Sequence, residues 1–464
     1  MEVRVRSLAM LFLCLAACGP SVSDYSANVD GGGSGDGGAN TPDAYSGPVG
    51  VIAGTVWAPG NAPGMVAAGH EFPIYGALVW LSISKPAPVP DQVYCDECVN
   101  APSNAVLSDH KGVFQLQDLV PGTYWLIIQK GQFRLDQQVT VTAGQTLQLQ
   151  ATATTLPSTR DPAAGKFIPR IALASGQYDD MQDIMGKLGI GAVDASGRFV
   201  ASSAAGIFDV YSNGGAIDNA AMGSLSSLVG DLDKMRNYHI IFIPCSGDQN
   251  TSALWNTQVL ANIRHYVKEG GKLYVTDWSG EWSDNVFPEQ IELRDDPFGD
   301  RIDTPANAYN AASDTWNTSM FGNADDLDDY TSDNAEAVDD DLNQWLHEQR
   351  GPLATGGQGL FDANNFVVTG AWDHITALNS VQVGTDEKGF PVHDDPKAFV
   401  IGDDGTGGGK KPLTVIYEPV GCGRVMYSTY HTTDDTHPGL VPQERILVYL
   451  IMEIGVCHSG PVID

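Results

Sequence analysis

Between residues 165 and 458, buried strand patterns alternate with amphipathic helix patterns, and this alternation strongly constrains the fold. Continuous apolar runs occupy 168–174 and 238–244. Apolar residues at helical spacing follow them in 179–188 and 257–268. Strands that alternate with helices form a parallel sheet covered by helices, because each parallel connection needs a long crossover. The sequence therefore predicts an α/β domain over 165–458.

Further segments of this region fit the same pattern. The additional strand-like runs are 208–211, 272–276, 413–417 and 423–428. A closing amphipathic helix is expected over 443–454. Asp339, Asp340 and Asp341 favour the first turn of another helix, because acidic side chains stabilise the positive end of the helix dipole.

Residues 49–153 have the pattern of an all-β domain. Short runs rich in β-branched and aromatic residues are separated by turns of glycine, proline and aspartate. These runs are 51–57, 77–83, 112–116, 124–128 and 138–142. Runs of this length and spacing predict a β-sandwich. We expect Trp57, Trp80 and Trp125 to be core residues rather than sugar-stacking residues.

A spaced pattern of turn and core residues runs through the second half of this segment. It reads Ser108-Asp109-x-x-Gly112-x-Phe114-x-Leu116-x-x-Leu119-x-Pro121-Gly122-x-Tyr124-x-Leu126. The pattern resembles the carboxypeptidase regulatory-like domain, whose fold is a carbohydrate-binding-like, prealbumin-like sandwich. The resemblance implies an accessory module without chemistry of its own.

Segments of the α/β region carry a second resemblance. They are Tyr238-x-Ile240-Ile241-Phe242-Ile243, Tyr266-Val267-x-x-Gly270-Gly271-Lys272-Leu273-Tyr274-Val275 and Gly423-Arg424-Val425-x-Tyr427-Ser428-x-x-His431. They resemble class I glutamine amidotransferase-like domains, most closely the ThuA-like branch. This resemblance implies a flavodoxin-like parallel sheet, interrupted here by an acidic insertion at about 295–370.

The resemblance also implies a cysteine nucleophile on a strained turn after the strand that ends at Val275. Such an elbow needs flanking glycines because its backbone packs closely. The sequence at that place is Thr276-Asp277-Trp278-Ser279-Gly280, which contains no cysteine. We therefore expect a domain that has lost its nucleophile and does not catalyse a reaction.

Cys245 is the alternative nucleophile. It follows the strand 238–244, at the edge of the sheet where α/β proteins bind ligands. His431, with Asp434 or Asp435 to orient it, would complete a Cys-His-Asp set. The alternative depends on whether Cys245 and His431 lie within hydrogen-bonding reach of each other.

The N-terminus has the layout of an export signal. Arg4 and Arg6 precede a short apolar run that ends in Leu15-Ala16-Ala17-Cys18. This ending resembles the bacterial lipoprotein signal. The resemblance implies that residues 1–18 form the lipoprotein signal segment, that the chain is cleaved before Cys18, and that Cys18 is lipidated. Residues 19–48, rich in Gly, Ser and Asp, predict a flexible tether. We expect a lipid-anchored cell-envelope protein, and Gly19 favours the outer membrane or cell surface.

The chain is strongly acidic, with 25 Lys and Arg against 57 Asp and Glu and a net charge of −32. This charge argues against a nucleic acid partner, because binding phosphates needs a basic face. No cofactor is predicted. The insertion nevertheless offers hard oxygen ligands for calcium, although their spacing is not that of an EF-hand. These candidates are Asp325, Asp326, Asp328 and Asp329.

Five cysteines remain after Cys14 leaves with the signal peptide and Cys18 is lipidated. They are Cys95, Cys98, Cys245, Cys422 and Cys457. The Cys95-x-x-Cys98 motif has zinc, redox and disulfide interpretations, and a local disulfide fits an oxidising compartment best. Cys422 and Cys457 flank the last strand and helix, so we expect them to form a second disulfide and leave Cys245 free.

Together these features predict a surface-tethered, two-domain lipoprotein with a non-catalytic binding role. Carbohydrate is the expected ligand class, by analogy with the sandwich fold alone. The other expected partners are the membrane, through the lipid, and a polysaccharide or envelope protein. The alternative is a ThuA-like or cysteine-dependent hydrolase that acts on extracellular sugars or amides.

Overall fold

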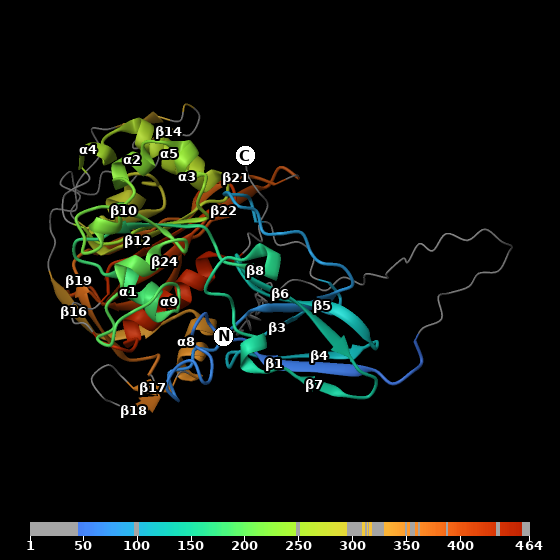
Figure 1. Cartoon of the computed structure of the whole chain (residues 1–464). Helices are drawn as coiled ribbons and strands as arrows, with labels where there is room; N and C mark the ends of the chain where they lie inside the picture. The colour runs from blue at the N-terminus through green and yellow to red at the C-terminus, as the bar shows by residue number, and fades with distance from the viewer. Residues whose placement is uncertain are drawn as a thin grey trace, which may run out of the picture.

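The computed structural model describes most of the chain after residue 44 (Figure 1). The described residues are 45–96, 102–246, 251–294, 309–310, 313, 315–317, 329–348, 350–352, 358–360, 362–386, 388–432 and 437–456. The predicted signal peptide, Cys18 and almost all of the tether lie outside them. No helix among the described residues is long and apolar enough to cross a membrane.

Residues 50–167 form two sheets, one of three strands in the order β4-β1-β7 and one of five in the order β3-β2-β5-β6-β8. Their strands are β1 (Gly50–Thr55), β2 (Leu78–Ser82), β3 (Val106–Leu107), β4 (Val113–Leu119), β5 (Gly122–Lys130), β6 (Phe133–Val141), β7 (Thr146–Gln148) and β8 (Lys166–Phe167). Buried side chains of both sheets, such as Ile52 and Ile128, belong to one hydrophobic cluster. The predicted all-β sandwich is therefore confirmed.

The turn before β4 has the chemistry that its sequence predicted. The Asp109 carboxylate accepts hydrogen bonds from the backbone N–H groups of Lys111 and Val113. Gly112 has a φ of +74°, and a Cβ there would lie 2.6 Å from the carbonyl oxygen of Val56. Glycine is required because a side chain would both strain the backbone and clash with the neighbouring strand.

The three tryptophans of the sandwich do not lie fully in its core. Trp57, Trp80 and Trp125 are each partly exposed. Trp80 lies on the outer face of β2, since its neighbours Val79 and Leu81 are the buried residues of that strand. The expectation of a core position is therefore wrong for Trp80.

The second part of the chain is built on a nine-stranded sheet in the order β10-β9-β11-β12-β25-β24-β23-β16-β19. The first five strands are parallel, and the remaining four join by antiparallel pairing. In chain order they are β9 (Ile171–Ser175), β10 (Asp209–Ser212), β11 (Ile240–Ile243), β12 (Lys272–Thr276), β16 (Tyr330–Ala337), β19 (Phe366–Ala371), β23 (Lys397–Asp403), β24 (Lys410–Tyr417) and β25 (Arg424–Ser428). Strands outnumber helices throughout the described residues.

Helices cover both faces of the parallel strands. They are α1 (Met181–Lys187), α2 (Leu225–Val229), α3 (Leu232–Met235), α4 (Thr251–Leu254), α5 (Thr257–Lys268), α6 (Glu281–Asp284), α8 (Asp340–Glu348) and α9 (Pro442–Ile454). Apolar residues of α1 and α9 join the cluster that contains Leu173 and Phe242. Those of α2 and α5 join the cluster that contains Ala172 and Ile241. Successive strand residues thus point to opposite helix layers, as expected for a parallel sheet.

Four short two-stranded sheets complete the described structure. Their strands are β13 (Ile291–Leu293) with β20 (Ile375–Leu378), β14 (Tyr309–Asn310) with β15 (Thr315–Trp316), β17 (Arg350–Pro352) with β18 (Gln358–Leu360), and β21 (Val381–Thr385) with β22 (Pro391–Asp394). The predicted insertion, 295–370, is not only peripheral. It supplies β16 and most of β19, the outer strands of the main sheet, together with α8.

The sandwich packs directly on the α/β part. Trp345 of α8 donates a hydrogen bond from Nε1 to the carbonyl oxygen of Pro73 at 3.0 Å, and its ring lies against Phe72. Lys130 forms a 2.8 Å ion pair with Glu453 of α9. A single hydrophobic cluster contains residues of both sandwich sheets, α1, α8 and α9. The two predicted domains therefore share one continuous interior.

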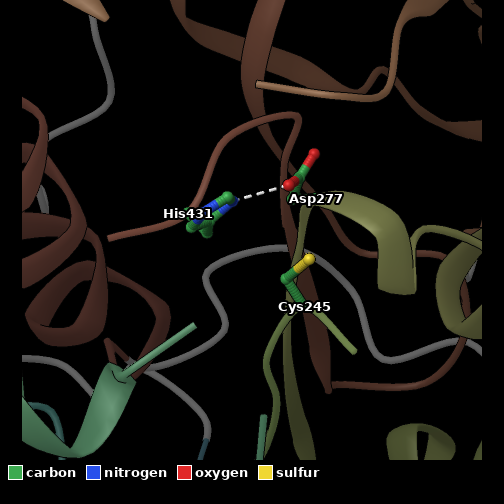
Figure 2. A group of neighbouring side chains, drawn as sticks. All are labelled: Cys245, Asp277 and His431. Atoms are coloured by element: carbon green, nitrogen blue, oxygen red, sulfur yellow. Dashed lines mark hydrogen bonds and ion pairs between the residues drawn. The ribbon is translucent and has the colours of Figure 1, made fainter. Parts of the chain in front are cut away.

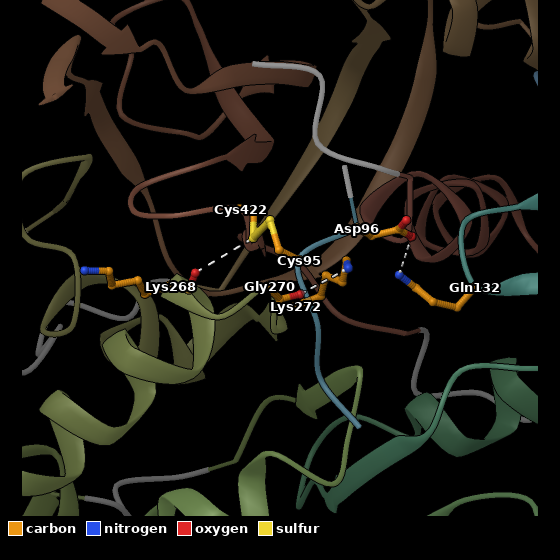
Figure 3. Close-up of a disulfide and its surroundings, with 7 residues drawn as sticks. All are labelled: Cys95, Asp96, Gln132, Lys268, Gly270, Lys272 and Cys422. Atoms are coloured by element: carbon orange, nitrogen blue, oxygen red, sulfur yellow. Dashed lines mark hydrogen bonds between the residues drawn. A yellow bond between two sulfur atoms is a disulfide. The ribbon is translucent and has the colours of Figure 1, made fainter. Parts of the chain in front are cut away.

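A disulfide also joins the two parts, between Cys95 and Cys422 (Figure 3). Both predicted pairings, Cys95–Cys98 and Cys422–Cys457, are therefore wrong. Cys98 and Cys457 lie outside the described residues, and Cys245 is a free thiol as expected. Both cysteine-bearing loops lie against the turn between α5 and β12, at the amino-terminal edge of the sheet: a Cβ on Gly270 would lie 2.1 Å from the carbonyl oxygen of Tyr94, and a Cβ on Gly421 would lie 2.1 Å from that of Lys268.

Candidate functional site

Three functional side chains follow neighbouring strands of the parallel sheet. Cys245 follows β11, Asp277 follows β12 and His431 follows β25. Because the carboxyl ends of adjacent parallel strands meet at one edge, these residues come together there (Figure 2). We call Cys245, Asp277 and His431 the trio.

The trio is compact and buried. One potential ligand atom of each residue lies within 4.8 Å of those of the other two. His431 Nδ1 is 2.6 Å from Asp277 Oδ2. The relative exposures of Cys245, Asp277 and His431 are 2%, 0% and 2%. The structure therefore brings Cys245 and His431 into one buried cluster.

The carboxylate beside His431 is not the one that the sequence suggested. Asp434 and Asp435 lie outside the described residues, whereas Asp277 occupies the Nδ1 side of the imidazole. Asp277 is 154 residues away from His431 in the chain. Its place directly after a buried strand is the sequence signal for this role.

Asp277 lies in a strained backbone conformation. Its φ is +47°, and among the described residues Asp118 is the only other non-glycine residue with a positive φ. Such a conformation costs roughly 1–3 kcal/mol and persists where surrounding contacts impose it. Here the Asp277 Oδ1 atom accepts a 2.9 Å hydrogen bond from the Trp372 N–H, and Tyr427 OH donates to the Asp277 carbonyl. Aspartate thus occupies a strained position directly after β12, where the sequence has no Gly-x-Cys-x-Gly elbow.

The backbone of His431 is fixed by a hydrogen bond, and a neighbouring glycine leaves room for its ring. Gln443 Nε2 donates hydrogen bonds to the carbonyl oxygens of His431, at 2.8 Å, and Thr369, at 2.9 Å. Gly370, with a φ of +66°, lies beside the imidazole, and a Cβ there would be 3.2 Å from Nε2 and Cε1. A side chain at this position would therefore press on the ring.

A buried carboxylate, Asp179, connects the loops that carry Cys245 and His431. Thr276 Oγ1 donates to Asp179 Oδ2 at 2.5 Å and accepts a 3.0 Å hydrogen bond from the Cys245 N–H. Thr432 Oγ1 donates to Asp179 Oδ1 at 2.8 Å. Burial raises the pKa of Asp179 despite these donors. The sequence offered no sign of this role beyond the position of Asp179 after a strand.

The surroundings of the trio favour the protonated form of the thiol. Burial is the main reason that the pKa of Cys245 is raised above its usual range, and the Asp277 carboxylate raises it further. A hydrogen bond with His431 acts in the opposite direction. The pKa of Asp373 is also raised well above its usual range by burial and then by Glu281, while Tyr427 donates to its carboxylate. The buried environment of Cys245 therefore opposes formation of its thiolate.

Three aromatic residues adjoin the trio. The rings of Tyr178 and Trp278 stack, with centroids 5.9 Å apart and planes inclined by 19°. Tyr178 donates its N–H to the Cys245 carbonyl, while Trp372 donates to Asp277 as described above. Tyr178 is 48% exposed and Trp372 is 37% exposed. Each of these aromatic residues is therefore either next to a trio residue in the sequence or hydrogen-bonded to one.

The calcium candidates are not assembled into a site in the described part of the chain. Asp325, Asp326 and Asp328 lie outside it, and Asp329 is exposed. Asp339 instead begins a helix, as expected, because its carboxylate accepts a 2.7 Å hydrogen bond from the Leu342 N–H ahead of α8. The trio is the one group of potential metal ligands found among the described residues.

A surface pocket lies elsewhere on the α/β part. It has a volume of about 520 Å³ and is bordered by residues of α5, including Thr257 and His265, and by Trp316. None of the trio lines it.

Comparisons with known proteins assign no family to this chain. No family model matches it, and no curated protein matches its sequence. A similarity to the minor pilin GBS52 of Streptococcus agalactiae covers 25% of this chain and 47% of the pilin, at 17% identity and a TM-score of 0.16. A similarity to the cytoplasmic protein STM3548 from Salmonella typhimurium covers 62% of this chain and 98% of that protein, at 13% identity and a TM-score of 0.29. The site chemistry therefore has to be judged from this chain's own residues.

Proposed function

We propose that this chain is a lipid-anchored protein of the bacterial cell envelope whose α/β domain hydrolyses extracellular sugars or amides. The observation that carries the proposal is the convergence of Cys245, Asp277 and His431 from three separate loops. Nucleophile, base and orienting carboxylate form the set that recurs on unrelated hydrolase folds. The missing cysteine after Val275 favoured a non-catalytic domain, but the assembled trio supplies an alternative to that cysteine.

In the thiol route for an amide, His431 acts as the base. Asp277, bonded to Nδ1, stabilises the imidazolium that forms when the ring turns away from Gly370 and its Nε2 takes the Cys245 proton. The sulfur then adds to the substrate carbonyl carbon, and the C–N bond breaks as His431 returns the proton to the departing amine. Water, deprotonated by His431, releases the acid and restores the thiol. A resting neutral thiol is compatible with this route, because the base is adjacent.

The two family resemblances remain part of the proposal. The parallel strand order β10-β9-β11-β12-β25 corresponds in chain order to 2-1-3-4-5, the arrangement of flavodoxin-like domains. This order supports the resemblance to class I glutamine amidotransferase-like domains. The two-sheet sandwich supports the resemblance to the carboxypeptidase regulatory-like domain, and we assign it an accessory role.

The second candidate is carbohydrate binding without catalysis. Tyr178, Trp278 and Trp372 favour it, because partly exposed aromatic rings provide apolar faces on which sugar rings can pack. The burial of Cys245 also favours it, since no substrate reaches a thiol that is 2% exposed without movement of the surrounding structure.

Turnover of glycosides, amides and peptides by the full-length protein in detergent tests the proposal. We expect Cys245→Ala and His431→Ala to lower kcat/KM for the accepted substrate by roughly 10⁴- to 10⁶-fold, as for other units of nucleophile and base. His393→Ala is the matched control, because His393 is an exposed histidine of β22. Turnover that survives in both trio variants would contradict the proposal. Sugar binding without turnover, lost in Trp372→Ala, would support the second candidate instead.

The anchor is tested separately by Cys18→Ser. Because a lipidated cysteine holds its protein on the membrane, the variant is expected to move from the detergent-extracted membrane fraction to the aqueous fraction. The control is Cys14→Ser, which changes the other cysteine of the predicted signal peptide without changing the attachment site. Retention of Cys18→Ser in the membrane fraction would show that the anchor is wrongly assigned.

A further inference from the structure

The trio has the composition of a metal centre as well as that of a hydrolase. It offers a sulfur, a carboxylate oxygen and an imidazole nitrogen, all within 4.8 Å of one another. Catalytic zinc sites hold their ion with three protein ligands of these types and keep a fourth position for water. The donor set is too soft for calcium or magnesium, which prefer oxygen alone.

The orientation of the His431 imidazole fits a metal centre. Nδ1 faces Asp277 Oδ2 at 2.6 Å, while the Nε2 and Cε1 edge lies nearest to Gly370. A Cβ on Gly370 would be 3.2 Å from Nε2 but 3.7 Å from Nδ1. A catalytic triad uses the two ring nitrogens for two different partners, whereas a metal centre needs only the nitrogen that faces the other ligands. Ligands of tetrahedral zinc lie about 3.3 Å apart, so Nδ1 and Oδ2 need to separate by less than 1 Å.

The local charge also favours a cation. Asp179 and Asp373 are buried near Asp277, and in the part of the chain that the structure describes neither pairs with a lysine or an arginine. His431 is the partner of Asp277 in the ion pair at this site. Buried carboxylates are normally paired with positive charge or bound to metal, because removing them from water is costly. Burial raises the pKa of Asp179 and Asp373, so the negative charge that a divalent ion would balance at the trio is that of the Asp277 carboxylate.

The contacts behind the trio match those of a preorganised centre. Asp277 Oδ1 is held by the Trp372 N–H, which leaves Oδ2 to face His431. The backbone of Cys245 is held by Thr276, and that of His431 by Gln443. Groups that orient metal ligands in this way commonly change metal affinity by about 10–100-fold.

We propose that Cys245, Asp277 and His431 bind a zinc ion through Sγ, a carboxylate oxygen and Nδ1. This assignment shares one premise with the proposed function, which is that the trio is the functional centre of the protein. Zinc binding occupies the Cys245 sulfur, so the zinc-bound state and the thiol route exclude each other. Cys245 is a ligand in the first and the nucleophile in the second.

Metal analysis of the full-length protein tests the site without an activity measurement. Protein purified without chelators and dialysed against zinc is expected to contain one zinc per chain by mass spectrometry. Cobalt in its place is expected to give the thiolate charge-transfer absorption and the visible bands of tetrahedral Co²⁺. Cys245→Ala, Asp277→Asn and His431→Ala are each expected to weaken binding by more than about 100-fold, beyond the loss of an outer contact. His393→Ala and Asp386→Asn, the latter in the turn between β21 and β22, are controls that should retain the ion.

Thermal unfolding with and without zinc guards against variants that do not fold. Zinc should raise the melting temperature of the parent protein and of the controls, and leave that of the trio variants unchanged, because only binding to the folded state stabilises it. Absence of zinc and cobalt binding by the parent, or undiminished binding by all three trio variants, would overturn the assignment. Hydrolysis that is inactivated by iodoacetamide, in a protein that binds neither zinc nor cobalt, would overturn the zinc site and leave the proposed function intact. Zinc binding without hydrolysis would overturn the proposed function and leave the zinc site intact.

Discussion

Replacing Cys422 with serine is expected to lower the free energy of unfolding by roughly 3–5 kcal/mol. The Cys95–Cys422 disulfide joins residues 327 positions apart and so restricts the unfolded chain over most of its length. In the chain-entropy model, the stabilisation grows with the length of the closed loop. Urea unfolding of the oxidised protein, followed by fluorescence, measures the change, and Cys95→Ser should give the same loss.

Cys98→Ser provides the matched control for the disulfide. Cys98 is three residues from Cys95 in the chain, so the sequence alone made it the nearer partner. If the bridge is Cys95–Cys422, Cys98→Ser should leave the free energy of unfolding unchanged. Destabilisation by Cys98→Ser equal to that by Cys95→Ser, with no effect of Cys422→Ser, would contradict the pairing.

Trp345→Ala is expected to cost about 3–5 kcal/mol, the range for removal of a buried large aromatic side chain. Trp345 is 1% exposed, and its ring centroid lies 4.8 Å from that of Phe72 and 5.2 Å from that of Tyr449. Its Nε1 also donates to Pro73, so the substitution removes both packing and a hydrogen bond between α8 and the sandwich. Urea unfolding measures the loss.

Two variants separate these contributions. Trp345→Phe keeps an aromatic ring and removes the N–H donor, so it should cost less than Trp345→Ala. Trp255→Ala removes a tryptophan that is 48% exposed and should change the free energy of unfolding by less than about 0.5 kcal/mol. Equal effects of Trp345→Ala and Trp255→Ala would mean that α8 does not couple the sandwich to the α/β part.

Elements with a strong local pattern were predictable from the sequence. The helix expected over 257–268 coincides with α5, since its apolar residues repeat at helical spacing and Gly270, with a φ of +102°, follows its end. The strand expected over 272–276 coincides with β12, whose residues are all buried. These patterns arise from burial on one helix stripe or on both strand faces, and each can be recognised without knowing the partner.

The antiparallel side of the sheet was not predictable in the same way. β16 reads Tyr330-Thr-Ser-Asp-Asn-Ala-Glu-Ala337, and its buried positions beyond Tyr330 hold small residues such as Ser332, Ala335 and Ala337. Such a strand lacks the β-branched and aromatic residues that mark a strand in sequence. Its structure depends on pairing with β19 and β23, which lie later in the chain.

By itself, the sequence determined the types of most elements, the absence of a cysteine after Val275, and the position of Cys245 and His431 at the ends of strands. The tertiary structure decided which residues are partners. Sequence proximity favoured Asp434 for His431 and Cys98 for Cys95, but the strand order places β12 between β11 and β25 and so brings Asp277 to His431. The approach of the 93–96 loop to the turn before β25 likewise pairs Cys95 with Cys422. Local patterns report burial, whereas partners that are 154 and 327 residues apart are selected only when the sheet is assembled.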